Sequence, residues 1–124
     1  MKKYFIIVSM IFFLFVSVSA KNNSENDFAN LKSTVLKNSL LTIYLMAKIT
    51  AINDRVDKLE KYIQYTTSKV NKNTLEAEEN YAIYSKASDK FEISLKYFTK
   101  VNTIYADDTK TDLEKLELIT KIQE

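Results

Sequence analysis

The sequence has no cysteine, histidine, glycine, proline or tryptophan, and Arg55 is its only arginine. Without cysteine it has neither a disulfide framework nor a thiolate nucleophile. Without histidine it lacks the usual general base at neutral pH and a usual zinc ligand. A phosphate-cradling loop depends on glycine. These absences exclude the commonest catalytic and metal-binding chemistries, so we expect a protein that is not an enzyme, with no catalytic residues, no metal and no cofactor.

The lack of glycine and proline also constrains the fold. A chain of 124 residues with average usage would contain roughly nine glycines and six prolines, the residues that tight turns and helix caps rely on. Their absence argues against any fold with many turns. We therefore predict an all-α fold: a long helical hairpin or coiled coil with a short third helix at the C-terminus.

The first twenty residues differ in character from the rest. Two lysines precede an apolar run, Tyr4–Val16, and small residues follow at Ser17–Ala20. This is the pattern of a secretory signal peptide that is cleaved after its last small residue. We predict a signal peptide over residues 1–20, a helical, coiled-coil-like domain over residues 21–124, and an exported protein that is periplasmic or secreted.

An uncleaved membrane anchor is the alternative for this segment. As a helix, residues 4–18 would rise roughly 22 Å, which is shorter than the roughly 30 Å hydrocarbon core of a bilayer. Without Lys2 and Lys3 the formal charge falls from +2 to 0, which leaves no basic footprint for nucleic acid. We expect no nucleic-acid partner, and membrane contact only indirectly or through an uncleaved N-terminus.

An apolar ladder with alternating steps of three and four residues runs from Phe28 to Ala77. A seven-residue repeat of this kind is typical of a helix that packs against another helix in a coiled coil. We expect one long helix from about Asp27 to about Val70. The helix seam is predicted to consist of Leu45, Ile49, Ile52, Val56, Leu59 and Ile63.

Between Leu36 and Ala51, apolar residues flank the ladder on nearly every side. A helix that is apolar on most faces is buried on more than one side. We expect this segment to lie in the middle of a bundle or against a partner. Additional partner-binding surface is assigned to Leu40, Ile43, Tyr44 and Met46.

Charged residues flank the second half of the ladder. Lysines follow Asp54 and Asp57 at a spacing of four, which favours ion pairs on a solvated helix face. Arg55 and Glu60 occupy a g position and the following e position. In coiled coils such positions set the choice of partner; otherwise the two residues form an ordinary surface pair.

A turn is expected at Asn71–Thr74. Asparagine and threonine disfavour helix interiors, and Asn73 with Glu76 three residues later resembles a capping box that starts a second helix. Because the apolar ladder continues to Ala77, one unbroken helix is the alternative. We favour the turn, and hence the hairpin.

The second helix is predicted to end near Ala106, and Thr111 with Glu114 forms a capping box ahead of a short third helix. The second helix carries an aromatic-rich ladder, whose rings are expected to pack on the aliphatic ladder of the first helix. Tyrosines either form an aromatic binding face or belong to the core with their hydroxyls at its rim. The set is Tyr62, Tyr65, Tyr81, Tyr84, Tyr97 and Tyr105.

Four features together resemble the borrelial (spirochaete) haemolysin accessory proteins of the BlyB family. They are a signal that starts Met-Lys-Lys-Tyr-Phe-Ile-Ile, a mature helical chain, no cysteine for lipidation, and a composition rich in Lys, Asn and Ile. The resemblance implies a plasmid-borne prophage operon and a small membrane-active helical partner in a holin-like, cytolytic system. We therefore expect an accessory protein that binds that peptide or associates with itself.

Two other functions fit the same pattern. A coiled-coil surface adhesin or host-factor binder would bind cells or serum proteins through the mature chain. A spanin-like tether would keep Met1–Ala20 as an uncleaved anchor and cross the periplasm as a coiled coil. The mass of the exported chain discriminates the tether from the other two.

Overall fold

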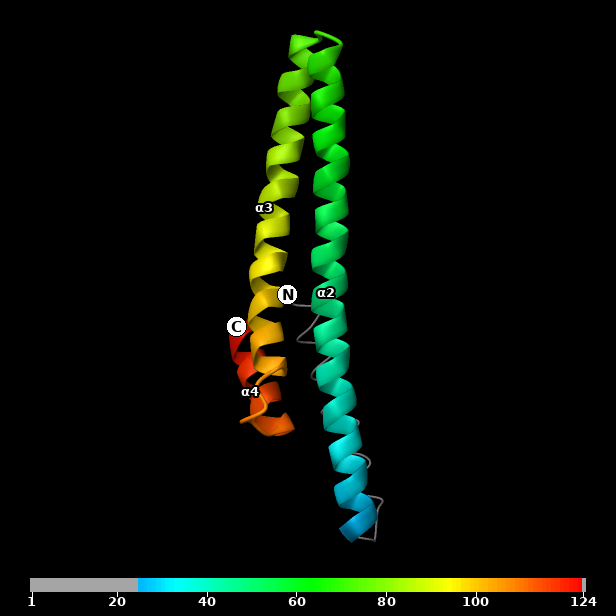
Figure 1. Cartoon of the computed structure of the whole chain (residues 1–124), viewed down its shortest axis with the longest axis vertical. Helices are drawn as coiled ribbons and strands as arrows, with labels where there is room; N and C mark the ends of the chain where they lie inside the picture. The colour runs from blue at the N-terminus through cyan, green and yellow to red at the C-terminus, as the bar shows by residue number, and fades with distance from the viewer. Residues whose placement is uncertain (1–24, 124) are drawn as a thin grey trace. The chain divides into compact units, whose positions relative to one another are not determined.

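The computed structural model describes residues 25–123, which form three helices: α2, Glu25–Val70; α3, Thr74–Tyr105; and α4, Asp112–Gln123 (Figure 1). Within these residues there is no β-strand. The all-α fold with a long helical hairpin and a short C-terminal helix is thus confirmed. The segment expected to be a signal peptide lies outside the described residues.

The connection between α2 and α3 is a Schellman motif built without glycine. Lys72 takes the left-handed conformation, with φ of 57°. The Asn73 N–H donates to the Ser68 carbonyl at 3.1 Å, and the Lys72 N–H donates to the Lys69 carbonyl at 3.1 Å. These are the two hydrogen bonds of the motif, and they end α2. The predicted turn, rather than an unbroken helix, is therefore confirmed.

Asn73 then begins α3 as its N-cap. Its side-chain oxygen accepts a hydrogen bond from the Glu76 N–H at 3.3 Å, and its side-chain amide donates to the Glu76 carboxylate at 2.8 Å. The predicted cap is present, although the side-chain amide of Asn73, rather than its backbone N–H, meets the carboxylate. One residue thus closes one helix and opens the next.

The connection from α3 to α4 is ordered by two carboxylates. Asp107 accepts hydrogen bonds from the hydroxyl and the N–H of Thr109, at 2.6 and 3.0 Å, which lower the pKa of Asp107. Glu114 accepts a hydrogen bond from the Thr111 N–H at 2.7 Å, and the Thr111 hydroxyl accepts one from the Glu114 N–H at 3.2 Å. The Thr111 N–H, and then its hydroxyl, lower the pKa of Glu114. The predicted capping box is confirmed.

Among the described residues, the contacts define two compact units: residues 25–46 with 100–123, and Ala47–Thr99. The first is termed the three-helix unit, because it contains the start of α2, the end of α3 and α4. The second is termed the two-helix unit, because it contains the rest of α2 and most of α3. The two units differ in the residues that they bury.

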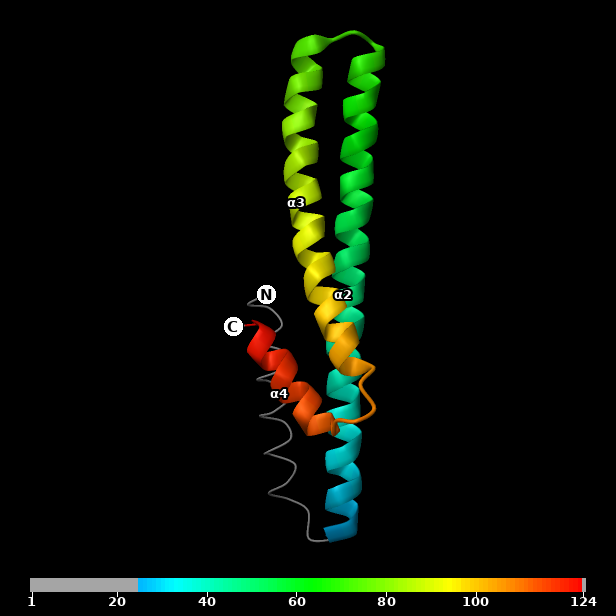
Figure 2. The same ribbon diagram turned by 60° about the vertical axis from the view of Figure 1, so that its left-hand side comes forward.

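The three-helix unit has an apolar core. Residues from all three helices contribute, and Figure 2 shows α4 turning back after the end of α3, with its first turn beside α2 and its last turn pointing away from the start of α2. Lys115, itself buried, donates from Nζ to the carbonyl of Tyr105 at 2.8 Å, so it satisfies the last residue of α3. A helix of 12 residues is unstable alone, and this packing holds α4. The core residues are Leu40, Ile43, Val101, Leu116 and Ile119.

In the two-helix unit, α2 and α3 run antiparallel and side by side (Figures 1 and 2). Apart from Tyr97, the buried side chains of this unit are small or polar, a composition that allows two helix axes to approach closely. They are Ala47, Ala51, Asp54 and Ser68 on α2, with Ala87 and Ser94 on α3.

Polar contacts also join the helices of this unit. Lys90 forms an ion pair with Asp54 at 3.5 Å, and the Asn80 side-chain amide donates to the Ser68 hydroxyl at 2.6 Å. Asp54 was expected on a solvated face, paired with a lysine of its own helix; it is 8% exposed and pairs with α3 instead. The other expected pair, Asp57 with Lys61, is present at 4.0 Å.

Candidate functional site

The six residues predicted to form the helix seam are exposed, from 43% for Leu45 to 62% for Ile63. At 3.6 residues per turn they lie on the side of α2 opposite Ala47, Ala51 and Asp54, which face α3. The prediction that they form the seam between the two long helices is therefore wrong. This surface, termed the outer stripe, consists of Leu45, Ile49, Ile52, Val56, Leu59 and Ile63.

The outer stripe is a substantial apolar surface. Complete burial of an aliphatic side chain stabilises by about 1.5–3 kcal/mol relative to exposure, so each half-exposed member would contribute roughly 1 kcal/mol when covered. Leu41, four residues before Leu45, is also exposed and adjoins the stripe. Contiguous apolar exposure of this kind is uncommon on monomeric proteins, so the stripe is the candidate site of this protein.

Exposed apolar residues on α3 are arranged differently. Ile83 and Ile93 are about half exposed and lie roughly 80° apart around the helix axis, and together with the remaining exposed apolar side chains of α3 they point in several directions, so the set forms no single line. The remaining ones are Leu75, Tyr81 and Leu95. Single exposed apolar side chains are ordinary on protein surfaces. The comparison with α3 indicates that the alignment on α2, rather than exposure itself, is the unusual feature.

The structure also corrects the second set of predicted partner-binding residues. Leu40 and Ile43, at 3% and 0% exposed, belong to the core of the three-helix unit and offer no accessible surface. Tyr44 is partly exposed, and its ring stacks on that of Tyr105 with centroids 4.6 Å apart. Met46 is also partly exposed. Leu40 and Ile43 hold this unit together instead of binding a partner, and the stacked ring of Tyr44 contributes to the same packing.

The predicted tyrosine set does not form one face. Tyr62 and Tyr65 of α2 contact Tyr84 and Tyr81 of α3, with ring centroids 5.4 and 5.3 Å apart. Tyr97 is buried. The aromatic residues of α3 thus meet tyrosines of α2, so the expectation that they would pack on the aliphatic ladder is wrong.

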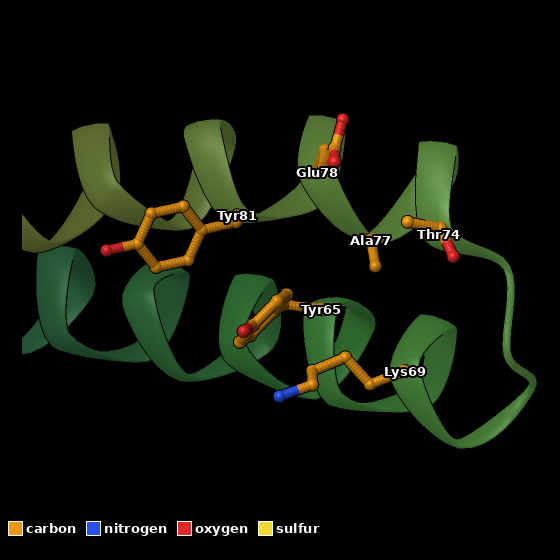
Figure 3. A pocket seen from close by; sticks show the side chains of 6 residues that line it. All are labelled: Tyr65, Lys69, Thr74, Ala77, Glu78 and Tyr81. Atoms are coloured by element: carbon orange, nitrogen blue, oxygen red, sulfur yellow. The ribbon is translucent and has the colours of Figure 1, made fainter.

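A shallow, open pocket of about 350 Å³ lies beside this cluster, near the connection between α2 and α3 (Figure 3). Lys69 Nζ lies 5.5 Å from the centroid of the Tyr65 ring, and Glu78 points away from the other lining side chains. We assign no ligand or reaction to this pocket. Its lining is Tyr65, Lys69, Thr74, Ala77, Glu78 and Tyr81.

The described residues offer no metal site, and one helix has the length to cross a membrane. Among residues 25–123, no group of three or more Asp or Glu side chains is arranged to hold a metal ion. By length and composition, α2 could cross a membrane, and most of its apolar window is not buried within the protein. Core helices of globular proteins meet the same criteria, so α2 is not assigned to a membrane on this ground.

Comparison with protein-family models, with curated proteins and with solved structures found no match for this chain. The candidate site is therefore defined by the burial and geometry of its own residues. Of the features described, the outer stripe is the one that combines large size, alignment and exposure.

Proposed function

We propose that this protein is a non-enzymatic, exported helical accessory protein of a small membrane-active, holin-like partner. The observation that carries the proposal is the exposed outer stripe of α2. An amphipathic helix can bury its apolar face on such a stripe, as helices do in apolar grooves and coiled coils. The resemblance to haemolysin accessory proteins supports a membrane-permeabilising peptide as the class of partner.

The partner would be held through its own apolar face. A membrane-active amphipathic helix inserts that same face into the lipid boundary, so the outer stripe and the membrane would compete for it. Binding would then limit or delay permeabilisation. The export signal predicted for residues 1–20 supports this role, because it would bring the protein to the surface on which such a peptide acts.

Dye release from lipid vesicles tests the proposal. The vesicles contain phosphatidylethanolamine and phosphatidylglycerol, and the probe is the small membrane peptide that the resemblance predicts beside this gene. We expect the protein alone to release no dye and to change the release caused by the peptide. The variant Ile52→Asp/Leu59→Asp should lose this effect while it keeps its helicity, because both side chains are about half exposed.

The matched control is Ile83→Asp/Ile93→Asp, which places the same charges on similarly exposed residues of α3. It should act like the unmodified protein. Equal activity of the stripe variant, or no effect of the protein on the peptide, would overturn the proposal. Dye release by the protein alone would instead make it the permeabilising agent.

The mass of the protein in its native host tests the expected export. A mass that matches Lys21–Glu124 in the soluble fraction supports the accessory role. A full-length mass in the membrane fraction supports the tether with an uncleaved anchor.

A further inference from the structure

We infer that a second copy of this chain covers the outer stripe, in a parallel, in-register pair of α2 helices. The inference rests on the proposed function in one respect, that the stripe is an interaction surface. It states what covers that surface when no peptide is bound. Five of the six stripe residues lie in the two-helix unit, where α3 packs on the opposite side of α2. Among residues 25–123, α3 therefore leaves these five side chains exposed.

The residue types along the stripe match a parallel dimer. Ile49, Val56 and Ile63 occupy the a positions of the seven-residue repeat, and all three are β-branched. The d positions hold two leucines, Leu45 and Leu59, with one isoleucine between them. β-branched residues at a with leucine at d favour a parallel coiled coil of two helices.

The flanking charges favour the same arrangement. Arg55 at g and Glu60 at the following e are both exposed, and within residues 25–123 neither side chain has an ionic or hydrogen-bonding partner. In a parallel, in-register pair, Arg55 would lie beside Glu60 of the partner subunit. The two-fold symmetry of the pair repeats this contact.

An antiparallel pair would bring g positions together instead. Lys48, Arg55 and Lys69 all occupy g positions, so that arrangement would place basic side chains against one another. The charges on the flanks of the stripe therefore select the parallel orientation, and the pairing of Arg55 with Glu60 selects the register.

The size of the interface indicates a reversible dimer. Covering six half-exposed side chains on each copy removes on the order of 1,000 Å² from solvent, near the lower limit for a specific interface. Because the hairpin already holds α2 as a helix, little ordering remains to oppose association. Such a pair dissociates on dilution, and the stripe then becomes available to another amphipathic helix.

Single cysteines test the orientation, because the chain has no cysteine of its own. In the full chain, Ile52→Cys and Leu59→Cys each place one thiol at a d position. In a parallel, in-register pair, each thiol lies within disulfide reach of the same thiol in the second copy. We expect mild oxidation to shift both variants from monomer to covalent dimer. Ile93→Cys, similarly exposed on α3, is the control and should remain a monomer.

Cross-linking at only one of the two stripe positions would indicate an antiparallel or staggered pair and would overturn the inference. Cross-linking of the Ile93→Cys control to the same extent would show random collision and would overturn it as well. A monomeric mass at every concentration, with no cross-linking at either position, would exclude the second copy.

Charge exchange tests the register. Arg55→Glu and Glu60→Lys each place like charges across the interface, so sedimentation should show a raised dissociation constant for both single variants. The double variant restores opposite charges and should recover the affinity of the unmodified chain. Single variants without effect, or a double variant no tighter than the singles, would overturn the proposed register.

The two proposals fail in distinguishable ways. A strictly monomeric protein that still changes dye release by the peptide would end the dimer inference and leave the proposed function standing. A parallel dimer without any effect on the peptide would do the opposite.

Discussion

The two compact units differ in what they bury. The three-helix unit buries five large aliphatic side chains, and α4 supplies two of them, Leu116 and Ile119. The two-helix unit buries mostly alanine, serine and one ion-paired aspartate, and leaves its large aliphatic side chains exposed, five of them on the outer stripe. The first unit therefore has an apolar core that forms within a single chain. The second unit leaves much of its apolar surface exposed.

The two faces of α2 therefore contribute to stability in different ways. The face toward α3 supplies a narrow seam with polar contacts at Asp54 and Ser68. The opposite face supplies apolar area, which contributes to stability only when it is covered. Substitutions in the three-helix core should act at any protein concentration, whereas substitutions in the outer stripe should act mainly through association.

The largest effect is expected in the three-helix core. Ile119→Ala should lower the free energy of unfolding by about 3 kcal/mol, because it leaves a cavity at a fully buried position. Ile52→Ala, at a half-exposed position, should lower it by less than about 1 kcal/mol in dilute protein. Urea unfolding followed by circular dichroism measures both. Equal losses would break the contrast between the two units.

The next largest effect is expected at the buried lysine. Lys115→Met removes the hydrogen bond to the Tyr105 carbonyl and leaves that acceptor unpaired, which should lower the free energy of unfolding by about 2 kcal/mol. Lys86→Met, at an exposed position on α3, is the control and should change little. Hydrogen exchange of α4 amides gives a second readout. Unchanged protection of α4 would show that the contact does not hold this helix.

A smaller loss is expected from overfilling the narrow seam. Ala51→Leu adds bulk where α2 meets α3 and should lower the free energy of unfolding by about 1–2 kcal/mol. Ala82→Leu makes the same change at an exposed position of α3 and should be nearly neutral. Thermal unfolding compares the pair. A more stable Ala51→Leu protein would mean that the seam has room for larger side chains.

The hairpin turn should yield a small gain. Lys72→Gly relieves the left-handed strain of a residue with a Cβ atom and should raise the free energy of unfolding by up to about 1 kcal/mol. Lys69→Gly, inside the last turn of α2, should instead lower it by about the same amount. A destabilised Lys72→Gly protein would contradict the role given to this turn.

The smallest effect is expected in acid, at the connection before α4. Hydrogen bonds lower the pKa of Glu114 and that of Asp107, so the ionised carboxylates favour the folded state. This contribution is complete above about pH 4.3 and is lost as the pH falls through the lowered pKa values. The start of α4 should then lose amide protection, and Glu114→Gln should reduce that pH dependence. Protection that stays constant in acid would contradict this account.

Much of the chain could be predicted because its signals are local. The absence of glycine and proline, together with the pairs Asn73–Glu76 and Thr111–Glu114, placed both connections and all three helices. Capping depends on residues three apart, which adjoin in any helix that starts there. The conformation of Lys72 carried no such signal, because the left-handed position of this motif usually holds glycine.

The inner face of α2 could not be predicted in the same way. Two ladders with the same spacing run along this helix: the outer stripe, and the line through Ala47, Ala51 and Asp54. Periodicity identifies both, but it does not reveal which one meets α3. The choice depends on the matching small residues of α3, Ala87 and Ser94, a tertiary property. Greater hydrophobicity pointed to the wrong ladder because the larger residues lie exposed on the side of α2 away from α3.

Buried Lys115 has a consequence for the chemical reactivity of the chain. Its amine donates to a backbone carbonyl and is shielded from solvent, and it is the only lysine in residues 25–123 that is buried. A reagent that acylates free amines can reach it only when α4 leaves its position. Its labelling rate, measured by mass spectrometry relative to that of the exposed lysines of the same molecule, therefore reports how often α4 opens.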